Sequence, residues 1–300
     1  MLRKIECAAV AQRLAAQARS RLSGANAGLA TGKRVCAVQV GGEQQAWYVN
    51  ARKHAERLAL KELGVSWETK TMDADSTANE IMSTVAALNN DPSVAGVLVV
   101  RPVPEQLSIN LLQQAVHPLK DIEGMHPNSI GRVVYGSKLQ GAILWPCTAK
   151  ASVEVLRQGL LDFEGTDSLA GVEVLVVGNS DVLVKPMVSI LHGEGATVTV
   201  CHPHMANFAA YTRSADVVVS SANLGHHTIS GDMLKPGAIL LDLGMNVADG
   251  KFVGGDVDLN SCGHIKAYSS LAHGIGRVRS AVMCDNLAQA ILELRKTSSA

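Results

Sequence analysis

Two kinds of hydrophobic pattern alternate along the chain and predict a mixed α/β fold. Valine-rich apolar runs without alternation, as at residues 94–100 and 172–177, are typical of parallel strands covered on both faces. Segments with apolar residues at helical spacing stand between such runs. We predict strands at residues 34–40, 65–71, 94–100, 172–177, 196–201, 216–220, 238–242 and 264–267. We predict helices at residues 5–22, 45–63, 75–88, 149–157, 186–192 and 280–296, with Thr148 as the cap of the fourth.

The order of these elements predicts two domains. Strands and helices alternate through the first third of the chain, as in helices packed on a parallel sheet. Residues 102–146 are rich in proline and glycine and predict long ordered loops, which often carry function. We expect an N-terminal α/β domain at residues 1–147, completed by a helix within residues 280–300. Residues 148–279 are expected to form a Rossmann-like, doubly wound parallel sheet.

The segment from Leu169 to His202 is the first candidate for chemistry. It reads as strand, turn, helix and strand, a βαβ unit whose helix N-terminus can seat a phosphate. The turn after Gly178 is not the usual G-x-G-x-x-G, because Ser180 and Leu183 stand where glycines would be. Taken alone, the segment fits a plain structural unit as well as a dinucleotide site.

Composition narrows the classes of function. The 27 Lys and Arg residues balance 27 Asp and Glu residues, and only 3% of residues are aromatic, so we expect no nucleic-acid partner. The six cysteines form no C-x-x-C pair and have no histidine at zinc-ligand spacing. They predict buried thiols in a reducing compartment and no metal site. The charged start and the lack of a membrane-length apolar run predict a cytoplasmic protein without a membrane partner.

A set of motifs spans nearly the whole chain. They are Tyr48-Val49 opening a basic helix, Gly96–Pro104, Pro118–Pro127, Pro146-Cys147-Thr148, Gly178-x-Ser180 with Lys185-Pro186-Met187, Thr197–His202 and Gly254–Asp258. Together they resemble the methylenetetrahydrofolate dehydrogenase/methenyltetrahydrofolate cyclohydrolase family, called FolD in bacteria. The resemblance implies a folate oxidoreductase with NADP or NAD on the second domain, a tetrahydrofolate derivative as substrate, and a homodimer.

The resemblance also implies roles for individual residues. The catalytic positions are Tyr48, Arg52 and Glu123. The substrate-binding positions are Tyr48, Val100, Pro102, Asp121, Glu123, His273 and Gly274. The cofactor-binding positions are Gly178, Asn179, Ser180, His202, Ser221, Gly244, Asp256 and Gly276.

Departures from the family pattern fall on the folate chemistry. The family has a lysine one helical turn after the tyrosine, and here that position is Arg52. Arginine stays protonated and cannot act as an acid/base at neutral pH, and Lys53 is rotated by about 100° around the helix. Val100 replaces the glutamine that bonds the family lysine, and Glu123 replaces the aspartate that binds the pterin edge. These changes predict an altered reaction.

The cofactor side departs as well. Val184 stands where the family turn has a glycine, and Asn179 where some members have an arginine. No acidic residue ends the second strand of the βαβ unit at Cys201-His202, so no carboxylate is offered to the ribose of NAD. NADP is therefore favoured over NAD.

The family loop that sits beside the nicotinamide and the folate is here Ser270–Arg279, which has lost its prolines. His273, Arg277 and Arg279 add bulk and charge to it. Two interpretations stay open: a surface loop with solvated arginines, or a cleft rebuilt for a different anionic group such as a polyglutamate tail.

Hydride transfer needs chiefly orientation of the folate, so it survives loss of the lysine better than hydrolysis does. We therefore expect an NAD(P)-dependent 5,10-methylenetetrahydrofolate dehydrogenase whose cyclohydrolase activity is weak or lost. The alternatives are a repurposed relative that passes the one-carbon unit to another acceptor, and a non-catalytic folate-binding protein. A structural partner for an active homologue is a further alternative.

Overall fold

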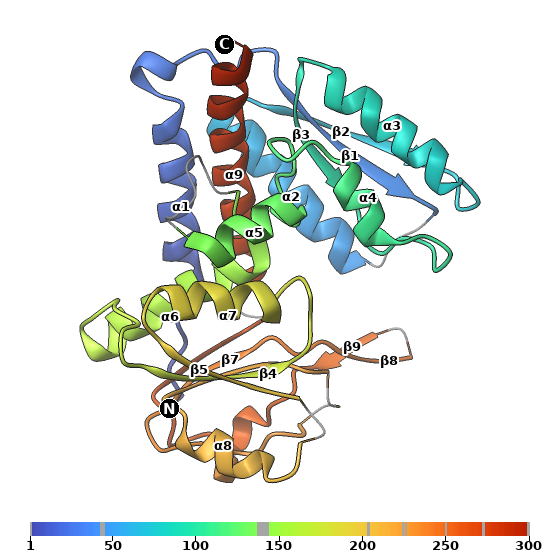
Figure 1. Ribbon diagram of the computed structural model, residues 1–300. Helices are drawn as coiled ribbons and strands as arrows, with labels where there is room; N and C mark the ends of the chain where they lie inside the picture. Colours follow the sequence, from blue (N-terminus) through green and yellow to red (C-terminus); the bar gives the residue numbers. More distant parts are fainter. Residues whose placement is uncertain are drawn as a thin grey trace. The chain divides into compact units, whose positions relative to one another are not determined.

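The computed structural model describes residues 2–42, 46–136, 144–202, 205–223, 225, 227–249, 251–271 and 274–298 (Figure 1). The chain divides into two compact units. The N-terminal unit joins residues 11–147 with residues 279–300, and the C-terminal unit joins residues 1–10 with residues 148–278. The pattern of elements assigns residues 1–10 to the first domain, but they belong to the C-terminal unit. The reason is a backbone bond, since the amide of Ile5 donates to the carbonyl of Tyr268 at 2.9 Å.

The N-terminal unit is built on a parallel sheet in the order β2-β1-β3. Its elements are α1 (Cys7–Arg21, which begins in the other unit), β1 (Arg34–Val40), α2 (Ala46–Leu63), β2 (Ser66–Met72), α3 (Ala78–Asn90), β3 (Val94–Val99), α4 (Ile109–Ala115), α5 (Pro127–Tyr135) and α9 (Ile275–Ser298, which also begins there). A parallel bridge between Val97 and Asp121 lays the segment after α4 beside β3. That segment also carries Glu123, so its pairing with β3 places Glu123 near the carboxyl end of this strand.

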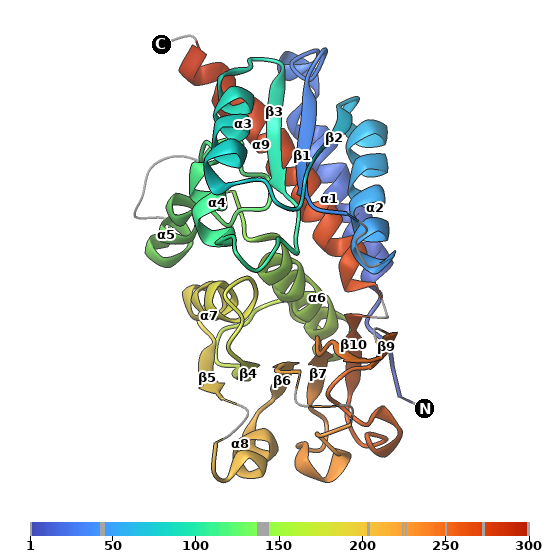
Figure 2. The same cartoon turned by 90° about the vertical axis from the view of Figure 1, so that its right-hand side faces the viewer.

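The alternation of β1 separates the two faces of this sheet. Val38 and Val40 pack with Ile81 and Val85 of α3 in one buried cluster. Gln39, between the two valines, points to the opposite face. Both views show α3 and α4 on one face and α2 and α9 on the other (Figures 1 and 2).

The C-terminal unit is a doubly wound parallel sheet in the order β10-β7-β6-β4-β5. Its elements are α6 (Cys147–Glu164, with Cys147 in the other unit), β4 (Glu173–Gly178), α7 (Val184–Gly193), β5 (Thr197–Cys201), α8 (Phe208–Ser214), β6 (Val217–Ser221), β7 (Ile239–Asp242), β8 (Asn246–Ala248), β9 (Lys251–Gly254) and β10 (Ala267–Ser270). Helices α6 and α7 cover one face and α8 the other (Figure 2). Strand order reverses between β4 and β6, where ligands bind in open sheets of this kind. The predicted two-domain α/β fold with a Rossmann-like second sheet is confirmed.

Several predicted elements are wrong in detail. Residues 102–146 are not only loops, because they contain α4 and α5. Both helices are short, and Pro127, which looks like a chain breaker, begins α5 in the first turn, where a missing N–H costs nothing. Thr148 lies inside α6 and does not cap it. The last predicted strand is displaced from residues 264–267 to β10.

The six cysteines are all free and buried. Among the described helices, none has the length and apolar character that crossing a bilayer requires.

Candidate functional site

Arg52 is held at the end of the N-terminal sheet by a glutamine that the motifs do not identify. Its Nη1 donates to Oε1 of Gln39 at 2.6 Å. The amide nitrogen of Gln39 donates to the carbonyl of Gly42 at 3.1 Å, which turns the amide oxygen toward the guanidinium. Val100, which replaces the family glutamine, is buried beside Gln39, and its N–H donates to the carbonyl of Val38 at 2.9 Å. Glutamine support therefore exists, but it comes from β1 and not from the end of β3.

The structure describes only some of the other residues that we predicted to lie near Arg52. Tyr48 lies in α2, but its side chain is outside the described residues, and so is all of His273. Pro102 follows Arg101 at the end of β3 through a cis peptide bond. The Nε atom of Arg101 is buried and has no hydrogen-bond partner among the described residues. No motif singles out this arginine.

Lys120 anchors the segment that carries the two acidic site residues. Its Nζ donates to the carbonyls of Leu88, Asn89 and Asp91 at 3.0, 2.7 and 2.8 Å, and so caps the C-terminal end of α3. Burial lowers the pKa of Lys120.

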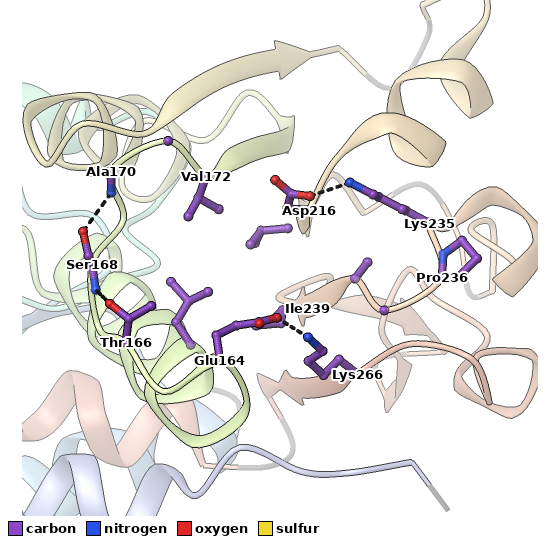
Figure 3. A pocket seen from close by; sticks show the side chains of 15 residues that line it. Glu164, Thr166, Ser168, Ala170, Val172, Asp216, Lys235, Pro236, Ile239 and Lys266 are labelled. Atoms are coloured by element: carbon purple, nitrogen blue, oxygen red, sulfur yellow. Dashed lines mark hydrogen bonds and ion pairs between the residues drawn. The ribbon is translucent and has the colours of Figure 1, made fainter.

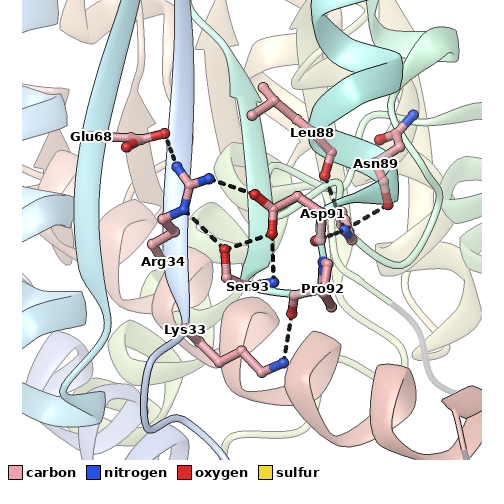
Figure 4. Close-up of polar contacts among 9 residues, drawn as sticks. Lys33, Arg34, Glu68, Leu88, Asn89, Asp91, Pro92 and Ser93 are labelled. Atoms are coloured by element: carbon pink, nitrogen blue, oxygen red, sulfur yellow. Dashed lines mark hydrogen bonds and ion pairs between the residues drawn. The ribbon is translucent and has the colours of Figure 1, made fainter.

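The turn after α3 is fixed separately by the carboxylate of Asp91 (Figure 4). Its Oδ1 accepts from the hydroxyl and the amide of Ser93, and its Oδ2 accepts from Arg34 at 2.6 Å. Bonds from Ser93 first, and then the Arg34 guanidinium, lower the pKa of Asp91 to about 2. Lys120 thus ties the segment of Asp121 and Glu123 to the end of α3, and Asp91 fixes the turn that follows this helix.

Asp121 is buried and faces the backbone of its own turn. Its Oδ2 accepts from the amide of His126 at 2.5 Å, at the start of α5. Burial, with a smaller contribution from the charge of Glu123, raises the pKa of Asp121 to about 7, although backbone amides lower it. The carboxyl therefore supports the turn, and a contact with substrate stays a prediction.

Glu123 forms an ion pair that the motifs did not predict. Its Oε1 accepts from Nη2 of Arg279 on α9 at 2.5 Å, with side chains 12% and 24% exposed. Its Oε2 lies 3.5 Å from Nε2 of Gln113 on α4. Arg279 is therefore a largely buried, paired side chain and not a solvated surface arginine. No local signal could have found a pair separated by 156 residues.

Cys147 lies behind this ion pair. Its thiol donates to the carbonyl of Ile122 at 3.3 Å, and the amide nitrogen of Asn286 donates to the same carbonyl at 3.0 Å. Burial raises the pKa of Cys147, and the nearby Glu123 charge adds to this, so the thiol is neutral and structural.

The predicted phosphate turn lies at the switch point of the C-terminal sheet. Gly178 ends β4 with φ +137°, and a Cβ there would overlap the carbonyl oxygen of Ser221 at the end of β6. The carbonyl of Ser180 accepts from the amides of Val184 and Lys185 at 2.9 and 3.2 Å. Those first-turn donors of α7 are thus already used, and the third residue of the helix is a proline.

Val184 also fills space in this turn. Its side chain is buried, and its Cγ2 lies 3.3 Å from where a Cβ on Gly178 would stand. Asn179 belongs to the same turn, and His202 is exposed at the end of β5. The structure therefore brings Gly178, Asn179, Ser180 and Ser221 to the expected edge, with Val184 beside them.

The remaining predicted cofactor residues belong to a buried network or to the start of α9. Asp256 accepts from the hydroxyl of Ser220 at 2.6 Å and from the amide of Ala222 at 3.0 Å. Asp242 accepts from the amides of Asp256 and Gly244 at 3.0 and 3.2 Å, and burial raises its pKa. This network shapes the loop after β7.

A small cavity of about 190 Å³ lies at the loop after β7, lined by residues including Gly244, Gly255 and Ser270. Gly274 and Gly276 stand at and just inside the start of α9, which begins at Ile275.

A cavity of about 600 Å³ lies elsewhere (Figure 3). It opens at the amino ends of β4, β6 and β7, opposite the Gly178 turn. Its charged side chains are paired with one another, Asp216 with Lys235 at 2.5 Å and Glu164 with Lys266. Ligands in open parallel sheets bind at the carboxyl ends, so this cavity is not the candidate site.

Comparisons with known proteins agree with both units. Residues 5–123 match the catalytic domain of the tetrahydrofolate dehydrogenase/cyclohydrolase family, and residues 146–295 match its NAD(P)-binding domain. The bifunctional protein FolD 2 of Mesorhizobium japonicum is 40% identical over 83% of this chain and 78% of its own length. FolD of Rhodobacter capsulatus is 37% identical over 95% of this chain and 91% of its own.

Solved structures show the same similarity. The crystal structure of FolD from Campylobacter jejuni is 25% identical, with a TM-score of 0.82 over 98% of this chain and 99% of that one. A 5,10-methylenetetrahydrofolate dehydrogenase from Bombyx mori is 27% identical, with a TM-score of 0.83 over 99% of this chain and 100% of that one.

Proposed function

The chain belongs to the tetrahydrofolate dehydrogenase/cyclohydrolase family, and we propose that it oxidises 5,10-methylenetetrahydrofolate with NADP⁺ while hydrolysing the methenyl product weakly or not at all. The bound nicotinamide would accept the hydride. The residues of this chain would bind and orient the folate, with Tyr48 against the ring system and Glu123 at the pterin edge.

The bond between Arg52 and Gln39 carries this proposal. A guanidinium stays protonated across the physiological range, and here it is also fixed as a donor to an amide oxygen. It can hold and polarise an oxygen of the substrate, but it cannot exchange a proton with an attacking water. Hydrolysis needs that exchange, whereas hydride transfer depends mainly on the alignment of two bound molecules.

The end of β3 offers a second support. The buried Nε of Arg101 lacks an acceptor among the described residues, and such a donor is costly to leave unpaired. An oxygen of a bound folate would supply the acceptor.

The C-terminal unit supports NADP with a modified turn. Gly178, Asn179 and Ser180 would face the pyrophosphate at the switch point, and Ser221 would line the adjoining strand end. The exposed His202 follows β5 where NAD-dependent proteins often place a carboxylate for the ribose. Because Val184 narrows the turn, we expect weaker cofactor binding than a glycine would allow.

Two absorbance assays test the proposal. Purified protein with methylenetetrahydrofolate should reduce NADP⁺ faster than NAD⁺ at equal concentrations. The same protein should hydrolyse methenyltetrahydrofolate at less than about a hundredth of the dehydrogenase rate, since general acid–base assistance is worth about 10²–10⁴-fold. Comparable rates of the two reactions would overturn the proposal.

The Arg279–Glu123 ion pair also favours a second candidate, a repurposed folate-binding protein. At the position of the family aspartate, this chain offers a glutamate that is already paired with an arginine. Folate binding by calorimetry without any nicotinamide reduction would select this candidate. Light scattering on the purified chain tests the homodimer that we also propose.

A further inference from the structure

Arg279 lies in a part of the N-terminal unit where two acidic side chains are buried close together. Asp121 and Glu123 are two residues apart, and both are largely removed from water. Among the described residues, the charged and titratable groups that act on them from other elements are Arg279 from α9 and the neutral thiol of Cys147 from α6. Helix α4 contributes only the uncharged amide of Gln113. The Arg279 guanidinium is therefore the cation that pairs with Glu123 in this largely buried site.

The replacement of aspartate by glutamate explains why such an anchor is needed. Glutamate has one more rotatable bond than aspartate, so fixing its carboxylate costs more conformational entropy. A bond from Nη2 of Arg279 to Oε1 at 2.5 Å removes that freedom. Among the described residues, Oε2 has only a long contact with Gln113, at 3.5 Å, and so retains capacity to accept hydrogen bonds.

We propose that Arg279 is a positioning residue that fixes the Glu123 carboxylate and leaves its second oxygen for the N–H donors of a 2-amino-4-oxopyrimidine ring, the edge common to reduced pterins. The inference rests on the proposed function for the identity of this ring. Arg279 itself does not touch the substrate. The glutamate and the arginine together replace the family aspartate.

Equilibrium binding of two probes tests this role in the full chain. The probes are tetrahydrofolate and a tetrahydropterin that lacks the aminobenzoyl-glutamate tail. Arg279→Met should weaken both by about 10- to 100-fold, because a charge-assisted bond that orders the acceptor is lost. Arg279→Lys should recover part of the loss. Weakened binding of tetrahydrofolate alone would overturn the inference, because Arg279 would then contact the anionic tail.

A double-mutant cycle separates positioning from direct contact. If Arg279 acts through Glu123, then Arg279→Met combined with Glu123→Gln should bind the tetrahydropterin no more weakly than Glu123→Gln alone. Additive losses would overturn the inference. The matched control is Lys296→Met, which removes an exposed ion pair with Glu293 on the same helix and should leave both affinities unchanged.

Two measurements check that each variant is folded. They are its thermal unfolding and its affinity for NADP⁺, which we propose binds to the C-terminal unit. These measurements need no turnover. If the wild-type protein binds tetrahydrofolate but does not reduce NADP⁺, the proposed dehydrogenase function fails and the role of Arg279 can still be decided. If Arg279→Met binds both probes as tightly as the wild type, the inference fails while the function stands.

Discussion

Arg52 on α2 donates to the side chain of Gln39 on β1 at 2.6 Å, so the cation at the family's lysine position is fixed by the neighbouring strand. The partner of Arg52 lies 13 residues before it. The site thus keeps an oriented positive charge although Val100 has removed the expected glutamine. On the function proposed above, this arrangement keeps the orientation that hydride transfer needs and lacks the proton exchange that hydrolysis needs.

Removing the support of Arg52 should slow the dehydrogenase. In Gln39→Met the guanidinium loses its acceptor, and a hydrogen bond to a charged group is worth about 1.5–3 kcal/mol. We expect kcat/KM for methylenetetrahydrofolate to fall by about tenfold or more, with the KM for NADP⁺ unchanged. Gln39→Glu keeps an acceptor and should retain more activity than Gln39→Met. Equal activity of Gln39→Met and the wild type would show that Arg52 needs no support.

Restoring the family pair should restore hydrolysis. The double variant Arg52→Lys, Val100→Gln supplies a lysine that can lose its proton and a glutamine at the end of β3 to hold it. We expect methenyltetrahydrofolate hydrolysis to rise by at least about tenfold, within the usual range of acid–base assistance. The single variant Val100→Gln is the control and should gain nothing. A double variant without hydrolysis would mean that this pair does not limit the reaction.

Replacing Lys120 should destabilise the protein, because its ammonium group donates three hydrogen bonds to backbone carbonyls. Lys120→Met would leave three backbone carbonyls at the end of α3 without their shared donor. We expect the free energy of unfolding to fall by about 3 kcal/mol, measured by urea denaturation. Lys33→Met is the matched control, because Lys33 makes one exposed bond to the carbonyl of Pro92 (Figure 4). It should cost less than about 0.5 kcal/mol, and similar losses in both variants would contradict the capping role.

Asp121 should make stability depend on pH. Its pKa is raised from 3.8 to about 7 in the folded state, so the folded protein binds more protons than the unfolded chain between these values. The stabilisation that Asp121 contributes to the folded state is therefore complete below about pH 4, and it is lost as the pH rises through about 7. Asp91 shifts the opposite way, to about 2, and loses its contribution only as the pH falls toward that value.

Urea titrations at a series of pH values check this dependence. The wild type should lose stability from pH 4 to pH 7, and Asp121→Asn, which does not titrate, should show a flatter profile. Parallel profiles for the two proteins would refute the assignment to Asp121.

Much of the fold follows from local patterns. The predicted strand at residues 34–40 coincides with β1, because the apolar run at residues 35–38 and the turn at Gly41 admit few alternatives. The cap of α3 is also local, since Thr77 and Glu80 form a reciprocal capping box. Helices α4 and α5 escaped prediction because they are too short for periodicity to show against nearby prolines.

The sequence by itself therefore determined most of the element order, the presence of two α/β units and the replacement of the family lysine by Arg52. Only the tertiary structure decided what those replacements touch. It pairs Arg52 with Gln39 across two elements and Arg279 with Glu123 across 156 residues. The physical reason is the distance along the chain over which each interaction acts. Hydrophobic periodicity and helix capping involve a few neighbouring residues, whereas an ion pair depends on which elements the packed sheet brings together.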